Sequence, residues 1–418
     1  MIYIIGSGFS GLTTAYSLYL KGIKATILSP GEVHKKKFFS LLKFIIKKEG
    51  EINSNSNYLT KQIKKVNNLK VGKCKYILSH TDGAQSNIWG GVLGNIENYD
   101  TSNFSLKKKE FLKNKKNLKD LKKIIGFPEK KFKEKKIKDK RIVERDYVIS
   151  KKNIGNLKKY LIKKNFKFKK DFFVKEINNK NKTLNIFDIK NQKYFKLPFK
   201  KVFLSCGPIE TSKLLINSIK NINKVEIKET QHFYSLVKVN KNIKSRFLEI
   251  NFSEYKFSCQ LYSFKNIFNI FLKETDKQKT FLKNDKYFIA QCYLNSSKSG
   301  KIIVKKSKGK FFITGKSNKK FNLLKFKKII SNFNKSNNFL YFKNISFNEI
   351  GSSNHLGASF PFITKKKKIL GVNKYGKLNY NNDIYITDSS VLNDIAISPI
   401  TIFSMNNILR MILSNSKI

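Results

Sequence analysis

The first 31 residues alternate between apolar runs and small polar turns in a regular order. Ile2–Ile5 is an apolar run of strand length, the stretch from about Gly11 to Lys21 is suited to a helix, and Ala25–Leu28 is a second apolar run. Short apolar runs bounded by glycine turns are typical of buried strands. This order predicts a β-strand, an α-helix and a second β-strand, which is the opening unit of an α/β fold.

A glycine turn joins the first predicted strand to the helix. Gly6, Gly8 and Gly11 give the pattern GxGxxG, with Phe9 and Ser10 between the last two glycines. The first glycine permits a tight turn, the second lets the backbone approach a pyrophosphate, and the third permits close packing of the helix on the strand. Together with the helix N-terminus they predict a dinucleotide site; the alternative is a glycine turn in an ordinary α/β unit.

The second predicted strand ends without the acidic residue that such a site commonly carries. About 20 residues after the glycines, an Asp or Glu usually binds the ribose hydroxyls. Ser29 stands there instead, and Glu32 follows shortly after it. Because a serine hydroxyl is able to hydrogen-bond a ribose, we expect Ser29 to weaken this contact rather than abolish it.

Patterns of a different kind fill the rest of the chain. Residues 231–315 are rich in Phe, Tyr and Ile, and their Ser-Gly and Lys-Gly breaks predict the hairpins of a mostly antiparallel sheet. A helix is expected over residues 322–336. Residues 101–150 are rich in lysine and helical in places, so we expect an exposed excursion there.

Lysine dominates the composition. Lys and Arg together number 86 of 418 residues against 28 Asp and Glu, a formal net charge of +58. Only four of these basic residues are arginines, the side chain that bidentate phosphate and base-edge recognition favours. We therefore expect a solvated lysine surface and no specific nucleic-acid partner, with weak association to an anionic membrane surface or polysaccharide as the alternative.

The cysteines and the hydropathy add three expectations. The four cysteines are widely spaced, with no CxxC pair and no cluster of metal-like spacing, at Cys74, Cys206, Cys259 and Cys292. Reduced thiols and no metal site are the expectation. No apolar run has the length to span a bilayer and no signal-peptide pattern is present, so a cytoplasmic protein is expected.

Five stretches of this lysine-rich chain carry no charged side chain. They are Met1–Leu20, Gly83–Ile96, Val202–Ile209, Ile350–Thr364 and Ile395–Leu409. Each also contains glycine, proline or another small residue at a turn. Charged side chains are costly in a buried apolar place, so we expect these five segments to meet in one pocket.

Four segments together resemble the glucose–methanol–choline (GMC) oxidoreductases, which are FAD enzymes that oxidise alcohols. "GAQSNIWGGVLG" is similar to a glycine-rich segment that lies along the flavin in this family, and "VFLSCGPIETSKLLINS" is similar to a strand and turn near the FAD. "NHLGASFPF" resembles the segment with the active-site histidine, and "DIYITDSSVLNDIAISPITIFSMNNILRMI" resembles the C-terminal flavin segment. The four segments occur in the family's order.

The resemblance implies FAD as the cofactor and assigns contacts to it. The matched positions are Gly83, Ser86, Asn87, Trp89 and Gly90, then Cys206, Gly207 and Glu210, and finally Asp388, Pro399, Ile400 and Thr401. Asp388 is expected on the flavin side. With Gly6, Gly8, Phe9, Ser10, Gly11 and Ser29 they make up the predicted FAD site.

The resemblance also makes His355 the catalytic base. A neutral imidazole, with an ordinary pKa of about 6.5, suits removal of a hydroxyl proton while hydride leaves the carbon. The family pairs this histidine with a second His or an Asn, where this chain has Ser398 before Pro399. We expect Ser398 to donate a hydrogen bond to the substrate oxygen. The alternatives are a core histidine at 355 and a base at His80, while His232 is expected to be structural.

The predicted architecture is α/β, with a Rossmann-like FAD-binding domain of residues 1–215 and 346–418 and a mostly antiparallel substrate-binding domain of residues 216–345. The predicted reaction is oxidation of a CH–OH group of an alcohol, sugar or sugar conjugate, because short relatives of the family belong to bacterial sugar and surface-polysaccharide metabolism. The electron acceptor is open. The alternatives are an NAD(P)-linked oxidoreductase and a catalytically impaired protein that binds polyanions through its lysines.

Overall fold

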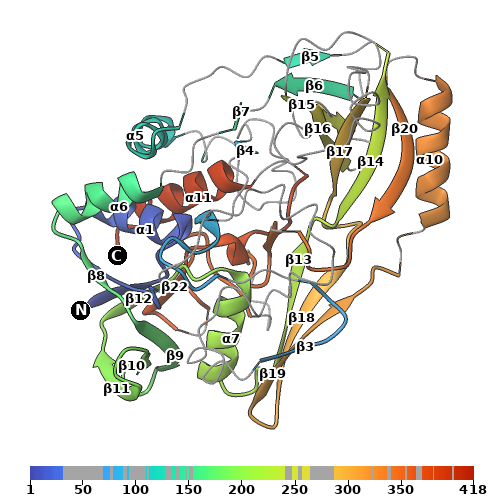
Figure 1. The fold of residues 1–418 in the computed structure, drawn as a ribbon. Helices are drawn as coiled ribbons and strands as arrows, with labels where there is room; N and C mark the ends of the chain where they lie inside the picture. Colours follow the sequence, from blue (N-terminus) through green and yellow to red (C-terminus); the bar gives the residue numbers. More distant parts are fainter. Residues whose placement is uncertain are drawn as a thin grey trace.

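The structure is a computed structural model that combines a parallel sheet under helices with a mostly antiparallel five-stranded sheet and an antiparallel seven-stranded sheet (Figure 1). It describes residues 1–31, 69–75, 79–87, 92–93, 110, 113–127, 134–136, 142–146, 148–149, 154–240, 247–252, 257–263, 287–319, 321, 323–336, 340–353, 355–363, 370–379, 381–397 and 400–418. The two termini lie on the same side of the molecule, next to the parallel sheet.

Five short strands form the parallel sheet. Their order is β22 (Ile384–Ile386), β12 (Lys201–Leu204), β1 (Ile2–Ile5), β2 (Thr26–Leu28) and β8 (Lys167–Lys169). Nearly every residue of β1, β12 and β22 is apolar and buried, as expected where layers cover both faces of a parallel sheet. The two predicted N-terminal strands are present, and they pair directly with each other in parallel.

Helices cover one face of this sheet and a small meander lies beyond the other (Figure 1). The helices on the first face are α1 (Phe9–Tyr19), α5 (Lys115–Ile125), α6 (Ile154–Lys163) and α11 (Thr401–Leu413), with α1 packed directly on α11 and α6. On the other side lie α7 (Pro208–Ser218) and the meander β9 (Phe172–Asn178), β10 (Thr183–Asp188) and β11 (Lys193–Pro198). Helix α1 begins directly after Gly8, two residues earlier than predicted.

Two further sheets extend away from the parallel one. A five-stranded sheet has the order β21 (Leu356–Gly357), β13 (Lys224–Glu229), β18 (Lys301–Ser307), β19 (Lys310–Lys316), β3 (Leu69–Val71). A seven-stranded sheet has the order β20 (Leu340–Phe347), β14 (His232–Val239), β17 (Tyr287–Leu294), β16 (Phe257–Ser263), β15 (Phe247–Phe252), β6 (Ile142–Asp146), β5 (Glu134–Lys136). Strands β4 (Val92–Leu93) and β7 (Val148–Ile149) form a separate pair.

The predicted antiparallel sheet and its hairpins are confirmed. All pairings within the seven-stranded sheet are antiparallel. Strands β18 and β19 form a hairpin whose two turn residues, Lys308 and Gly309, both have positive φ. Such a turn matches the twist of the paired strands, and glycine accommodates it without strain. The predicted helix is α10 (Leu323–Ser336), which lies along the outer side of β20.

The described residues form two large hydrophobic cores. The larger core contains the parallel sheet and its helices, but also Val225 and Ile227 of β13 and the buried residues of the β18–β19 hairpin. The smaller core lies on the seven-stranded sheet, between its strands and α10. The smaller core contains no residue before Phe233 and none of the hairpin. The predicted domain boundaries stay predictions.

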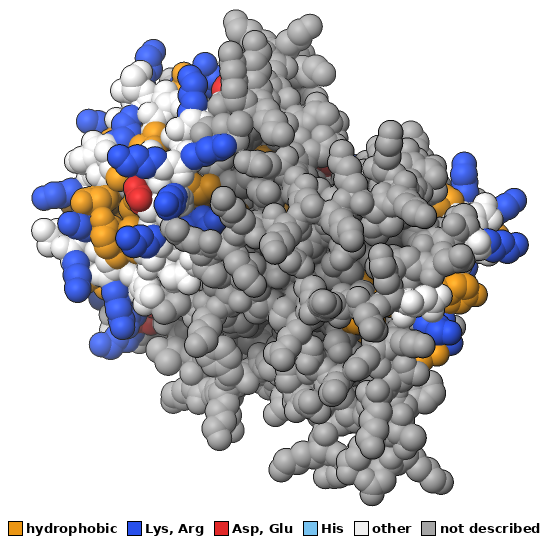
Figure 2. All heavy atoms as spheres, turned by 90° about the horizontal axis from the view of Figure 1, so that it is seen from above, with side chains coloured by type: hydrophobic (Ala, Val, Ile, Leu, Met, Phe, Trp, Pro, Cys, Tyr) orange, Lys and Arg blue, Asp and Glu red, His pale blue; other side chains and the backbone are white. Residues whose placement is uncertain are grey.

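Residues 101–150 contain more ordered packing than the predicted exposed excursion. Helix α5 buries Leu118, Leu121 and Ile125 in the larger core, because apolar residues recur on one face while lysines occupy the other. Strands β5 and β6 join the edge of the seven-stranded sheet. On the described part of the surface seen from above, lysine and arginine side chains are numerous and acidic ones few (Figure 2). Among the described residues, no helix is long and apolar enough to cross a membrane.

Candidate functional site

One cavity lies where the parallel sheet meets helices α1, α7 and α11. Residues from all five uncharged stretches line it: Ile5–Ser10, Ala84–Ser86, Ser205–Ile209, His355 with Leu356, and Ile400, Thr401, Ser404 and Met405. The first and third of these follow strands β1 and β12 at the carboxyl edge of the sheet, the edge where open α/β sheets bind ligands. The predicted meeting of the uncharged stretches is therefore confirmed.

The glycine turn after β1 forms one wall of the cavity. Gly6 has φ +111°, and a Cβ there would lie 2.5 Å from the Ser205 carbonyl oxygen, so only glycine fits. A Cβ at Gly11 would overlap the Gly6 carbonyl oxygen, which shows how closely α1 packs on the turn. Gly8 differs, because it lines the cavity and its nearest contact would be the Ala84 Cβ at 3.4 Å. Its missing side chain leaves room for a ligand.

Three helix N-termini face the cavity. Gly8 is the N-cap of α1, Gly207 that of α7 and Ile400 that of α11, and none caps its helix with a side chain. Each of these residues lines the cavity, as do Phe9, Ser10 and Thr401. Uncapped helix N-termini present backbone N–H groups and a partial positive charge. At α1 and α11 these groups favour an anionic ligand, whereas the start of α7 carries Pro208 and two carboxylates, those of Asp388 and Glu210.

Ser29 lies at the end of β2, on the cavity wall. Its hydroxyl lies 2.9 Å from the Ser7 hydroxyl and accepts the Gly31 N–H at 3.2 Å. The Ser7 hydroxyl in turn accepts the Gly83 N–H. Of the predicted residues in this segment, Ser86 lines the cavity, whereas Gly83 and Asn87 do not. Gly83 instead supports the cavity wall through its hydrogen bond to Ser7.

A group of buried charged and polar side chains lies on the same wall. Lys213 Nζ donates to Glu210 Oε1 at 2.7 Å, and His80 Nε2 lies 3.6 Å from the same oxygen. Burial raises the pKa of Glu210, but the Lys213 ammonium and His80 outweigh it and lower that pKa to about 2. Glu210 is therefore ionised at neutral pH, and both Glu210 and His80 line the cavity.

Asp388 joins two elements at the wall of the cavity. Its Oδ2 accepts the Gly207 N–H at 2.9 Å and the Thr211 hydroxyl at 2.6 Å, and its Oδ1 accepts the Ser390 N–H at 2.9 Å. Burial raises the pKa of Asp388, while these donors act in the opposite direction. The carboxylate thus fixes the start of α7 against the 3₁₀ turn Ser389–Val391 (η3). Asp388 and its neighbour Cys206 both line the cavity.

His355 lies on the cavity wall, immediately before β21. Burial lowers the pKa of its imidazole to about 4, so the ring is neutral at physiological pH. Neither ring nitrogen has a hydrogen-bond partner among the described side chains, and Nδ1 is fully buried. The backbone is held instead, since the His355 carbonyl accepts the Thr230 N–H at 3.3 Å. An unpartnered neutral imidazole at a cavity is able to accept a proton from a ligand.

Two aromatic residues beside His355 were not expected at the site. Tyr293 stacks on the imidazole with ring centroids 4.8 Å apart, and His232 lies 6.4 Å from it. Burial lowers the pKa of His232 to about 3, and His355 adds to this effect. His232 and Tyr293 are directly opposite one another on β14 and β17, so the strand register brings them together.

A buried carboxylate holds the turn that precedes His355. Both oxygens of Glu229 accept the Gly351 N–H at 2.9 Å, and Oε2 also accepts the Ser353 hydroxyl at 3.2 Å. Burial raises the pKa of Glu229 to about 7, with these donors acting the other way. The sequence offers one signal for it, a lone acidic residue directly before "TQH" and at the end of an alternating strand.

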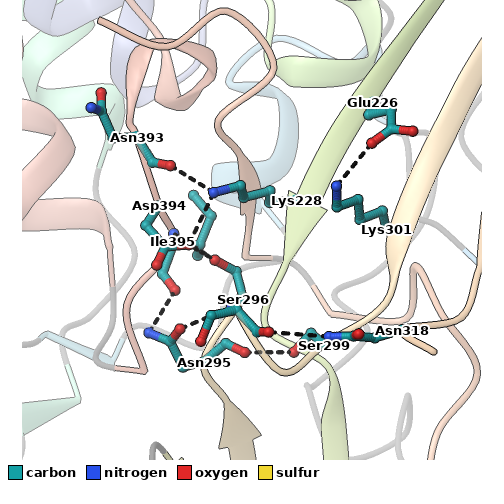
Figure 3. Close-up of polar contacts among 11 residues, drawn as sticks. Glu226, Lys228, Asn295, Ser296, Ser299, Lys301, Asn318, Asn393, Asp394 and Ile395 are labelled. Carbon is teal, nitrogen blue, oxygen red and sulfur yellow. Dashed lines mark hydrogen bonds and ion pairs between the residues drawn. The ribbon is translucent and has the colours of Figure 1, made fainter. Parts of the chain in front are cut away.

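The segment that leads to Ser398 is fixed on two sides. The Ser296 hydroxyl donates to Asp394 and accepts the Ile395 N–H at 3.0 Å, while Lys228 Nζ donates to the Asn393 carbonyl at 2.8 Å (Figure 3). These contacts join residues 393–395 to the turn after β17 and to strand β13. Four predicted site residues, Trp89, Gly90, Ser398 and Pro399, lie outside the described residues.

Comparison with known proteins shows a similarity in fold and none in sequence. No family model matches the chain, and no curated protein matches its sequence. Among solved structures, the crystal structure of pyridoxine 4-oxidase from Mesorbium loti is similar with a TM-score of 0.58 at 9% sequence identity, over 98% of each chain. At this identity the similarity describes the architecture: the whole chain has a fold like that of this oxidase.

Proposed function

We propose that the protein is an FAD-dependent oxidoreductase of GMC type that oxidises a CH–OH group. The residues present fit a flavin dinucleotide. Gly8 leaves open space beside an uncapped helix N-terminus, as a pyrophosphate requires, and apolar side chains such as Phe173 and Met405 line other parts of the same cavity. The fold, similar to that of an oxidase over nearly its whole length, agrees with this proposal.

The observation that carries the proposal is the position of His355. One continuous cavity contains both the glycine turn and this neutral, unpartnered imidazole. Bound FAD would supply the acceptor for the hydride that leaves the substrate carbon. His355 would take the hydroxyl proton on a ring nitrogen, so that the alcohol becomes a carbonyl. The plane of the imidazole is fixed by Tyr293, and its backbone by the Thr230 N–H.

The proposed substrate is a small alcohol, with a sugar or sugar-conjugate hydroxyl favoured. The seven-stranded sheet would form the substrate side, because β14 and β17 bring His232 and Tyr293 next to His355. Pyridoxine belongs in the test panel because of the fold similarity.

The test is the visible spectrum of the protein folded with FAD, before and after acid precipitation. We expect one equivalent of flavin that is released into the supernatant, because the proposed contacts are non-covalent. Anaerobic mixing with the panel of sugars, simple alcohols and pyridoxine should then bleach the flavin with at least one compound. A folded, colourless protein that takes up no FAD would refute the proposal, and NAD(P) uptake by that protein would favour a nicotinamide enzyme instead.

A further inference from the structure

The dinucleotide cavity lacks an acidic group at the position where a ribose is commonly bound. Ser29 stands at the end of β2, and its hydroxyl is already engaged by the Ser7 hydroxyl and the Gly31 N–H. A hydroxyl has one proton and two lone pairs, so little of its capacity remains for a ribose diol. Another group on the same wall would have to supply the missing acceptor.

The cavity wall continues from Ser29 to a carboxylate. The Ser29 carbonyl accepts the Phe172 N–H at 3.1 Å, which places the start of β9 beside the end of β2. The ring of Phe173 lies 5.7 Å from that of His80, and His80 Nε2 lies 3.6 Å from Glu210 Oε1. All five residues line the cavity, so a series of contacts along its wall connects Ser29 with Glu210.

The two oxygens of Glu210 have different surroundings. Lys213 and His80 both contact Oε1. Among the described residues, no group donates a hydrogen bond to Oε2. The side chain is 13% exposed, and it is part of the cavity lining. An ionised carboxylate oxygen with open lone pairs at a cavity is a strong acceptor for a ligand hydroxyl.

We propose that Glu210, through Oε2, binds the ribose hydroxyls of the adenosine half of the cofactor and replaces the acidic residue absent at Ser29. This inference rests on the proposed function, because it takes the ligand to be an adenine dinucleotide. Lys213 holds the carboxylate in place through Oε1 and His80 contacts the same oxygen, which leaves Oε2 for a ligand. The acceptor thus comes from the first turn of α7 rather than from the end of β2.

The test compares ADP with 2′-deoxy-ADP by calorimetric titration of the flavin-free protein. Wild type should bind ADP roughly 10–100-fold more tightly, the effect of one charge-assisted hydrogen bond. Glu210→Ala should bring this ratio close to one because the acceptor is gone, and Glu210→Gln should lower it to at most about tenfold, the effect of one neutral hydrogen bond. The ratio is taken within each variant, so any loss of folding stability cancels. The matched control is Glu226→Gln, a Glu on β13 paired with Lys301 and remote from the cavity lining, which should keep the wild-type ratio.

The outcomes separate this inference from the proposed function. If the wild type takes up FAD but binds both nucleotides equally, the role of Glu210 is overturned and the proposed function stands. Retention of the full ratio in Glu210→Ala would overturn it too. Protein that binds neither FAD nor ADP would overturn both proposals.

Discussion

The imidazole of His355 lies nearly parallel to the ring of Tyr293, with 13° between their planes and 4.8 Å between their centroids. The other neighbour of Tyr293 is His232, which meets it edge to face at 4.4 Å. Since no described side chain hydrogen-bonds to the His355 ring, this stack is what fixes its plane. Two residues distant in sequence, Tyr293 and His232, therefore lie beside the imidazole of His355.

Replacement of Tyr293 should separate stacking from hydrogen bonding. Tyr293→Phe keeps a flat ring beside His355, so flavin reduction by the best substrate should stay within about threefold of wild type. Tyr293→Leu removes the stack, and a loss of about 0.5–1.5 kcal/mol in orientation would slow reduction by up to roughly tenfold. Anaerobic stopped-flow absorbance measures both rates. Equal rates in all three proteins would show that the stack does not orient the base.

His355→Asn should slow flavin reduction by roughly 10²–10⁴-fold while FAD stays bound, because the group that removes the proton is lost. His80→Asn is the matched control, since it changes the other histidine that lines the cavity. The same stopped-flow assay compares both variants with wild type. If His355→Asn reduces its flavin at the wild-type rate and His80→Asn does not, His80 is the base.

Ser398 was predicted to assist His355 as a hydrogen-bond donor, and this role stays a prediction. Ser398→Ala should cost about 0.5–1.5 kcal/mol in the rate of reduction, the value of one neutral hydrogen bond. Ser398→His, which restores the usual pair of the resembled family, should maintain or raise the rate. A loss in Ser398→Ala as large as that in His355→Asn would instead make Ser398 indispensable for proton removal.

The buried carboxyl of Glu229 should make stability fall as pH rises. Its folded pKa of about 7 lies above the ordinary value of 4.5, so the folded protein holds a proton that the unfolded chain releases. This contribution is complete below about pH 4.5 and is lost as pH rises through 7, on the order of 1 kcal/mol per pH unit. Urea unfolding at several pH values should therefore show wild type losing stability relative to Glu229→Gln across this window.

The comparison with Glu229→Gln isolates this one group. The depressed pKa values of His232 and His355 act with the opposite sign, because protons bind preferentially to the unfolded chain as pH falls below about 6.5. Both histidines are present in both proteins, so their contribution cancels in the difference. Parallel stability curves between pH 4.5 and 7 would contradict a raised pKa at Glu229.

The glycines of the N-terminal turn should respond differently to one added methyl group. Gly8→Ala meets only ordinary contacts, so the protein should fold normally but bind FAD more weakly, because the methyl group occupies ligand space. Gly11→Ala would clash with the Gly6 carbonyl oxygen, so it should lower the unfolding temperature of the flavin-free protein. Thermal unfolding and flavin fluorescence titration measure the two effects. Equal unfolding temperatures in both variants would contradict the assignment.

Local sequence patterns predicted the features that depend on a few neighbouring residues. The β1–α1–β2 unit and the β18–β19 hairpin follow from glycine positions and apolar runs, and both are present. The uncharged stretches predicted the cavity because burial excludes charge wherever a segment comes from. Charged residues concealed β6, since three of its five residues are charged and it lies inside a lysine-rich segment. It pairs with β15 on one side and with the edge strand β5 on the other.

Contacts between distant strands could not be predicted, because they depend on register. Cys259 and Cys292 appeared as isolated thiols in the sequence, yet they face each other on β16 and β17 with their sulfurs 2.6 Å apart. The contact between His232 and Tyr293 arises in the same way. A shift of one residue in either strand pair would remove these neighbours, and no local pattern records the shift.

Three short chain segments connect the seven-stranded sheet to the five-stranded sheet, and all three meet at Gln231. Its carbonyl accepts the Leu294 N–H at 3.0 Å, its N–H donates to the Ser299 hydroxyl at 2.8 Å, and its side-chain amide donates to the Asn348 carbonyl at 2.9 Å. Next to it, the Thr230 N–H binds the His355 carbonyl. A hinge motion between the two sheets would have to break these hydrogen bonds, which lie beside the proposed base. The hydrogen bonds of Gln231 therefore oppose a hinge motion between the two sheets at this point.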